Sequence, residues 1–188
     1  IYGYGLMNEP HDLTPETSWF DMAQASINAI REVDTNTLIM VGGNDWSSAE
    51  RWIEQSDTLK YLKDPANNLA FEAHVYFDKD ASGTYKYSYE KEECYPEKGI
   101  DRVKPFVEWI KQNKFHGFIG EYGIPDNDPR WNETLDLFLG YLQENGINGT
   151  YWAAGPWWDT YFMAITPKDG KDRPQMPIIE KYTSTLKK

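Results

Sequence analysis

Short apolar segments alternate with longer amphipathic segments along this chain of 188 residues. The apolar segments are rich in β-branched and aromatic residues and predict strands at residues 2–7, 38–41, 69–75, 118–119 and 150–152. Between them, apolar side chains recur at helical spacing and predict helices at residues 15–32, 49–55, 101–112, 132–144 and 175–186. Such β-then-α alternation predicts an α/β fold with a parallel sheet, either doubly wound or barrel-like.

The helix ends carry local signals of their own. Thr14 before Pro15 predicts an N-cap with proline at the first helical position, and Gly146 predicts a helix C-terminus. Residues 77–98 form one long, polar, tyrosine-rich loop, in which Tyr85, Tyr87 and Tyr89 alternate at period two. We expect this loop to line a substrate cleft, although the alternation also fits a packed strand edge.

Two acidic residues stand at the carboxyl ends of predicted strands. Glu9 follows the first strand, and Glu121 closes the apolar stretch around residue 119. Burial and strand propensity both disfavour a carboxylate there, so we expect a function to keep each of them. Two facing carboxyl groups can cleave a glycosidic bond if one is protonated and the other is ionised.

Composition narrows the class of partner. The chain has 30 Asp and Glu against 19 Lys and Arg, a formal charge of -11 and an isoelectric point near 4.7. Such a charge disfavours nucleic acids and anionic membranes. The 8 Trp and 13 Tyr favour a neutral sugar, whose apolar ring face stacks on indole. Of these, Trp19, Trp52 and Trp109 lie in helical patterns and are expected in the core.

No metal or other cofactor is predicted. Residues 78–83 copy the opening of a calcium-binding loop, but Tyr89 stands at the twelfth position, where a bidentate Glu is required. The three histidines have no recurrent ligand spacing. Cys94 is the only cysteine, so no internal disulfide can form.

Four motifs in this order carry a resemblance to a known family. They are residues 5–12 (GLMNEPHD), 72–78 (EAHVYFD), 117–123 (GFIGEYG) and 151–158 (YWAAGPWW). Together they resemble glycoside hydrolase family 5, the cellulase-type endo-β-1,4-glucanases. The resemblance implies a partial (β/α)8 TIM barrel that covers strands four to eight with their helices. Residues 1–188 are then a single catalytic-domain fragment without strands one to three.

The resemblance also implies roles for individual residues. Glu9 matches the family's acid/base and Glu121 its nucleophile. Asn8 matches the residue that hydrogen-bonds the sugar 2-hydroxyl, and the wall of the cleavage subsite is matched by His74, Tyr76 and Trp152. Three further tryptophans follow strands and are candidate sugar platforms: Trp46, Trp157 and Trp158.

We therefore expect a secreted, extracellular enzyme that hydrolyses internal β-1,4 bonds of cellulose-like glucans with retention and without a cofactor. Relatives with the same acid pair cut mannan, xyloglucan or β-1,3-glucan, and these substrates stay open, as does an inactive sugar-binding fragment. Besides the β-glucan substrate, the expected partners are the missing N-terminal half-barrel or a second copy of the chain. Strands that lose their neighbours expose unpaired edges, so the isolated chain is expected to be marginally stable or oligomeric.

Overall fold

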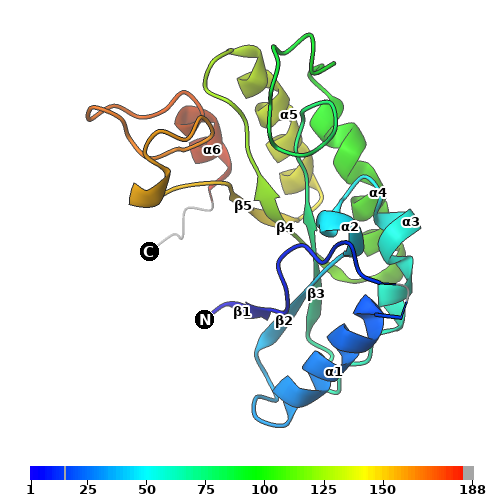
Figure 1. The fold of residues 1–188 in the computed structure, drawn as a ribbon. Coiled ribbons are helices and arrows are strands. Elements are labelled where there is room, and N and C mark those ends of the chain that lie inside the picture. Colours follow the sequence, from blue (N-terminus) through cyan, green and yellow to red (C-terminus); the bar gives the residue numbers. More distant parts are fainter. Residues whose placement is uncertain (15, 184–188) are drawn as a thin grey trace. The chain divides into compact units, whose positions relative to one another are not determined.

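The computed structural model describes residues 1–14 and 16–183, in which strands and helices alternate as the sequence predicts (Figure 1). The strands are β1 (Gly3–Gly5), β2 (Leu38–Gly42), β3 (Leu69–His74), β4 (His116–Tyr122) and β5 (Asn148–Tyr151). The α-helices are α1 (Trp19–Arg31), α2 (Asn44–Ser47), α3 (Trp52–Ser56), α4 (Lys98–Asn113), α5 (Arg130–Glu144) and α6 (Met176–Tyr182). Two short 3-10 helices, η1 (Asp57–Tyr61) and η2 (Pro156–Trp158), were not predicted.

The chain forms two compact units. The first consists of Ile1–His74 and Val103–Gly120, and the second of Val75–Arg102 and Glu121–Lys188, described to residue 183. In the first unit β1 pairs in parallel with β2, and β2 pairs in parallel with β3. The last two residues of β4 and the whole of β5 belong to the second unit. Within the described residues, no helix is both long and apolar enough to cross a membrane.

An aromatic cluster forms the core of the first unit. The indole of Trp52 meets the ring of Phe106 edge-on at 4.6 Å, and Phe71 of β3 meets Trp109 of α4 at 4.9 Å. Trp19 is also buried and donates its Nε1–H to the carbonyl oxygen of Gly42 over 2.8 Å. The prediction that these three tryptophans serve the core is confirmed.

The core of the second unit is built around Trp131 of α5. Its indole is buried and receives the edges of Tyr85 at 5.0 Å and Tyr89 at 4.7 Å. Tyr87, between them, is exposed. Residues 77–97 contain neither a helix nor a strand, so the long loop is confirmed and the strand-edge interpretation of its tyrosines is wrong.

The turn that resembles a calcium loop is held by its own backbone. The buried carboxylate of Asp78 accepts hydrogen bonds from the N–H groups of Gly83, Thr84 and Tyr85 at 3.0–3.1 Å. Gly83 takes a positive φ of 72°, which suits glycine at this bend. The alternating oxygens in the sequence therefore have a structural explanation as an Asp-centred turn.

Helix ends were predicted less accurately than helix positions. Helix α1 begins at Trp19, because Ser18 has extended backbone angles and its hydroxyl accepts the N–H of Asp21 over 3.2 Å. The predicted start at Thr14 and Pro15 is thus wrong, and Pro15 itself lies outside the described residues, as does the predicted end of the last helix at residue 186. Gly146 follows the end of α5 with φ 67°, which confirms the predicted stop.

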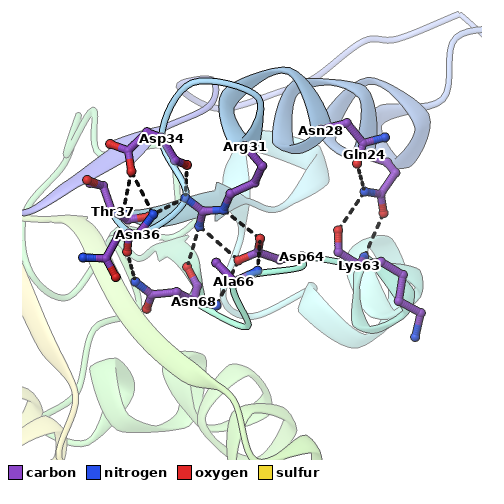
Figure 2. Close-up of polar contacts among 10 residues, drawn as sticks. All are labelled: Gln24, Asn28, Arg31, Asp34, Asn36, Thr37, Lys63, Asp64, Ala66 and Asn68. Carbon is purple, nitrogen blue, oxygen red and sulfur yellow. Dashed lines mark hydrogen bonds and ion pairs between the residues drawn. The ribbon is translucent and has the colours of Figure 1, made fainter.

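A buried ion pair ties together the amino ends of β2 and β3 (Figure 2). Arg31, the last residue of α1, donates through Nε to Asp64 Oδ1 over 2.7 Å and through its second terminal nitrogen to Oδ2 over 3.0 Å. The same guanidinium donates to the carbonyl oxygens of Asp34 and Thr37. The side chains of Arg31 and Asp64 are only 4% and 2% exposed, so the two charges depend on each other.

Removing this cation should destabilise the fold. In Arg31→Met the Asp64 carboxylate stays buried without its counter-charge, and we expect the free energy of unfolding to fall by about 3–5 kcal/mol. Urea unfolding followed by tryptophan fluorescence measures the change. Lys60→Met is the matched control, because the Lys60–Asp57 pair of 2.6 Å is partly exposed and its removal should leave stability nearly unchanged. Equal losses in the two variants would contradict the assignment.

The contribution of this pair should depend on pH. Burial raises the pKa of Asp64, but the Arg31 guanidinium and the N–H groups of Asn68 and Ala66 outweigh burial and hold the pKa below its usual value. An Asp whose pKa is lower in the folded protein than in the unfolded chain stabilises the fold at pH values above its unfolded pKa of about 3.9. This stabilisation is lost as the pH falls through the folded pKa. The stability difference between the wild type and Arg31→Met should therefore be largest at neutral pH and should shrink in more acidic urea titrations, toward and below the unfolded pKa of about 3.9.

Candidate active site

Glu9 lies just beyond β1, in a backbone conformation that few side chains adopt. Its φ is 44°, in the left-handed region, which costs on the order of 1–3 kcal/mol for a residue other than glycine. Its Oε1 lies 2.7 Å from Nδ1 of His74, the last residue of β3. Strain of this kind collects at functional sites, so the geometry supports a functional role for Glu9.

His74 is buried and contacts two carboxyl groups in the first unit. Nδ1 faces Glu9, and Nε2 lies 3.2 Å from Oε1 of Glu72. Glu72 and His74 stand two residues apart on β3 and therefore share one face of the strand. The imidazole is thus a link between the end of β1 and the interior of β3.

Glu121 lies in the second unit, at the next-to-last position of β4 and not beyond the strand as predicted. The hydroxyl of Tyr76 donates a hydrogen bond of 2.7 Å to Oε2 of Glu121, and the N–H of Val75 donates to the Glu121 carbonyl oxygen over 3.0 Å. Burial, and next the charge of Glu121, raise the pKa of Tyr76 well above its usual value. The phenol therefore remains a donor at neutral pH and favours the ionised form of Glu121.

The predicted tryptophans after β5 form part of an aromatic group in the second unit. Trp152 accepts the edge of Trp158 at 5.0 Å, and Trp158 contacts Tyr161 at the same centroid distance. The Trp152 N–H donates to the carbonyl oxygen of Tyr122, which fixes the chain beside the end of β4. Trp157 is 89% exposed and offers an indole face to a ligand in solution.

The short helix α2, directly after β2, presents another exposed indole in the first unit. Trp46 stacks on the imidazole of His11 with 4.4 Å between centroids and 12° between planes. Asp45, Trp46 and Ser47 all have positive φ values, between 54° and 57°. An ion pair of 2.6 Å between Asp45 and Arg51 braces this run. Asn8, the residue before Glu9, is exposed.

Two residues of this region were missed from the sequence. The sequence did hold a signal for Glu72, because it is an acid within an apolar strand, two positions before His74. Its contact with the His74 imidazole, however, could be identified only from the structure. His11 was weighed only as a metal ligand, yet it lies against Trp46. Stacking between residues 35 positions apart leaves no signal in local periodicity.

These groups suit acid–base chemistry with a nucleophile. A carboxylate that accepts a hydrogen bond from a permanently protonated phenol is held as an anion. A carboxyl group beside an imidazole has a partner that can both give and accept a proton. The exposed indoles provide flat apolar surfaces of the kind that stack on sugar rings.

Comparison with known proteins agrees with this chemistry. Residues 1–157 match the family model described as cellulase, glycosyl hydrolase family 5. A probable endo-β-1,4-glucanase B from Aspergillus kawachii is 37% identical over 181 residues, and endo-β-1,4-glucanase B from Emericella nidulans is 37% identical over 168 residues. The matches cover 93% and 87% of this chain but only 52% and 49% of those proteins, so the chain spans about half the length of its relatives.

Solved structures give the same picture. Endoglucanase Cel5A from Pseudomonas stutzeri in complex with cellobiose has a TM-score of 0.89 at 45% identity, with 96% of this chain and 54% of that chain covered. An endo-β-1,4-glucanase from Xanthomonas axonopodis pv. citri has a TM-score of 0.85 at 40% identity, with 95% and 58% covered. These neighbours confirm the predicted fold class, β/α units of a (β/α)8 TIM barrel. The chain belongs to the cellulase family, glycosyl hydrolase family 5.

Proposed function

We propose that the protein is an endo-acting, retaining glycoside hydrolase that cleaves internal β-1,4-glucosidic bonds of cellulose or related β-glucans. The observation that carries the proposal is the different environment of two acids in a chain of this family. Glu121 accepts a hydrogen bond from a phenol, and Glu9 contacts an imidazole. Retention requires one carboxylate to attack and one carboxylic acid to donate a proton.

In this mechanism Glu121 attacks the anomeric carbon and forms a covalent glycosyl-enzyme. Glu9 gives its proton to the oxygen of the departing sugar and then removes a proton from the water that hydrolyses the intermediate. Tyr76 stabilises the Glu121 anion before attack, through the 2.7 Å hydrogen bond. His74 orients the carboxyl group of Glu9.

Aromatic residues are proposed to bind the glucan chain. Trp152 and Trp158 contact each other near the end of β4, while Trp46 and Trp157 expose their indoles to solvent. We propose that Asn8, exposed beside Glu9, hydrogen-bonds a sugar hydroxyl.

The relatives favour β-1,4-glucan over the other substrates considered. The proteins that match this chain at 34–37% identity are described as endo-β-1,4-glucanases or as an endoglucanase. Two of the structural neighbours are complexes with cellobiose and cellopentaose. A polymer such as cellulose cannot enter a cell, so we also propose that the protein acts outside it.

Loss of the nucleophile should abolish hydrolysis. Glu121→Gln keeps the size of the side chain but removes the attacking charge, and reducing-sugar release from carboxymethylcellulose should fall roughly a thousand-fold or more. The assay is made on the protein that carries this chain. Glu54→Gln, on the exposed side of α3, should retain full activity. Equal release by the wild type and Glu121→Gln would refute the proposed function.

Tyr76→Phe should lower turnover without abolishing it. A hydrogen bond to a charged group contributes about 1.5–3 kcal/mol, which corresponds to a decrease in kcat of roughly 10- to 100-fold. The matched control is Tyr87→Phe, which removes the hydroxyl of an exposed tyrosine in the same loop. Steady-state kinetics on a soluble cello-oligosaccharide measures both. A Tyr76→Phe variant as active as Tyr87→Phe would show that the phenol does not support the nucleophile.

A further inference from the structure

Glu72 is an acid within the apolar strand β3, and none of the proposed catalytic roles uses it. The strand reads LAFEAH, and the neighbours Phe71 and Ala73 are both buried. A carboxylate in such a segment loses hydration unless specific partners replace the water. The Glu72 carboxylate therefore needs a partner that interacts with its charge.

A glycine on β4 provides the space for this carboxyl group. A Cβ added at Gly120 would collide with Oε1 of Glu72 and would lie 2.7 Å from its Cδ. Glycine inside a strand is unfavourable by roughly 0.5–1 kcal/mol relative to alanine. Gly120 on β4 and Glu72 on β3 are thus both needed to place this carboxylate.

The contact with His74 constrains where the imidazole proton lies. If Glu72 is ionised it can only accept hydrogen bonds, and the Nε2 atom that lies 3.2 Å from it then carries the imidazole proton. In a neutral imidazole the other nitrogen then has a free electron pair and is an acceptor. That nitrogen, Nδ1, lies 2.7 Å from Oε1 of Glu9.

The direction of the second hydrogen bond follows. If Nδ1 accepts, Glu9 must donate, and only a protonated carboxyl group can do so. We propose that Glu72 is a positioning residue for acid catalysis, which holds His74 in the Nε2–H tautomer so that Glu9 is kept as a proton donor. Without Glu72 the imidazole is free to place its proton on Nδ1 and to donate to an ionised Glu9. The inference rests on the proposed function, because it assumes that Glu9 is the acid.

The test uses two substrates that differ in their need for an acid. Cellotetraose has a sugar leaving group that must be protonated, whereas 2,4-dinitrophenyl β-cellobioside has a leaving group that departs as an anion. The parameter is kcat/KM, which reports the formation of the glycosyl-enzyme. In Glu72→Met we expect kcat/KM for cellotetraose to fall about 10- to 100-fold and that for the dinitrophenyl substrate to change less than about three-fold. Glu72→Ala, which removes the hydrogen-bond acceptor without adding bulk, should show the same selectivity if Glu72→Met does not fold.

Glu9→Gln is the reference for lost acid catalysis and should show the same selectivity with a larger effect. Equal losses on both substrates in the Glu72 variants would mean a structural role only, and no loss on either would mean no role; both outcomes overturn the inference while leaving the proposed function intact. A wild type that cleaves neither substrate, or a Glu9→Gln variant with unchanged cellotetraose hydrolysis, would instead refute the proposed function itself.

Discussion

The hydrogen bond between Nδ1 of His74 and Oε1 of Glu9, 2.7 Å long, is the interaction on which the candidate chemistry of the first unit depends. Glu9 follows a strand of only three residues and has a left-handed backbone conformation that its own sequence does not favour. Two contacts hold this segment: the buried imidazole, and the carbonyl oxygen of Pro10, which accepts the N–H of Trp46. The tertiary structure therefore compensates for local strain at the residue proposed as the acid.

Stability and chemistry occupy opposite ends of the strands in the first unit. At the amino ends of β2 and β3, Arg31 and Asp64 form a buried bidentate pair whose oxygens and nitrogens also satisfy nearby backbone groups (Figure 2). At the carboxyl ends, Glu9 and Trp46 remain partly exposed and have strained backbones. This division is expected for a parallel α/β fold, in which loops that follow the strands carry the functional groups.

The sequence predicted the elements well because each rests on a local pattern. Apolar runs and helical spacing located the strands and most helices, and the position of two acids at strand ends made Glu9 and Glu121 candidates for the site. The features that could not be predicted from the sequence depend on contacts between residues that are distant along the chain. Helix α1 begins at Trp19, where the hydroxyl of Ser18 caps it and the indole of Trp19 bonds the carbonyl oxygen of Gly42. Trp131 is buried against Tyr85 and Tyr89, which come from the long loop. The space that Gly120 leaves for Glu72 is equally invisible in either strand alone.

The difference between a phenol and an imidazole gives a physical reason for the roles of the two acids. Tyr76 is a donor over the whole working range of pH, since burial and the nearby carboxylate raise its pKa, so its hydrogen bond favours the anionic form of Glu121. The Nδ1 atom of an imidazole accepts a hydrogen bond when it is unprotonated and donates one when the ring carries a second proton, so His74 is compatible with Glu9 both before and after proton transfer. A nucleophile must stay ionised until it attacks, while an acid/base must change its protonation state twice in each turnover. The chemistry of the neighbours thus matches the demands on each carboxyl group, and exchanging the roles would leave the acid with a partner that opposes its protonation.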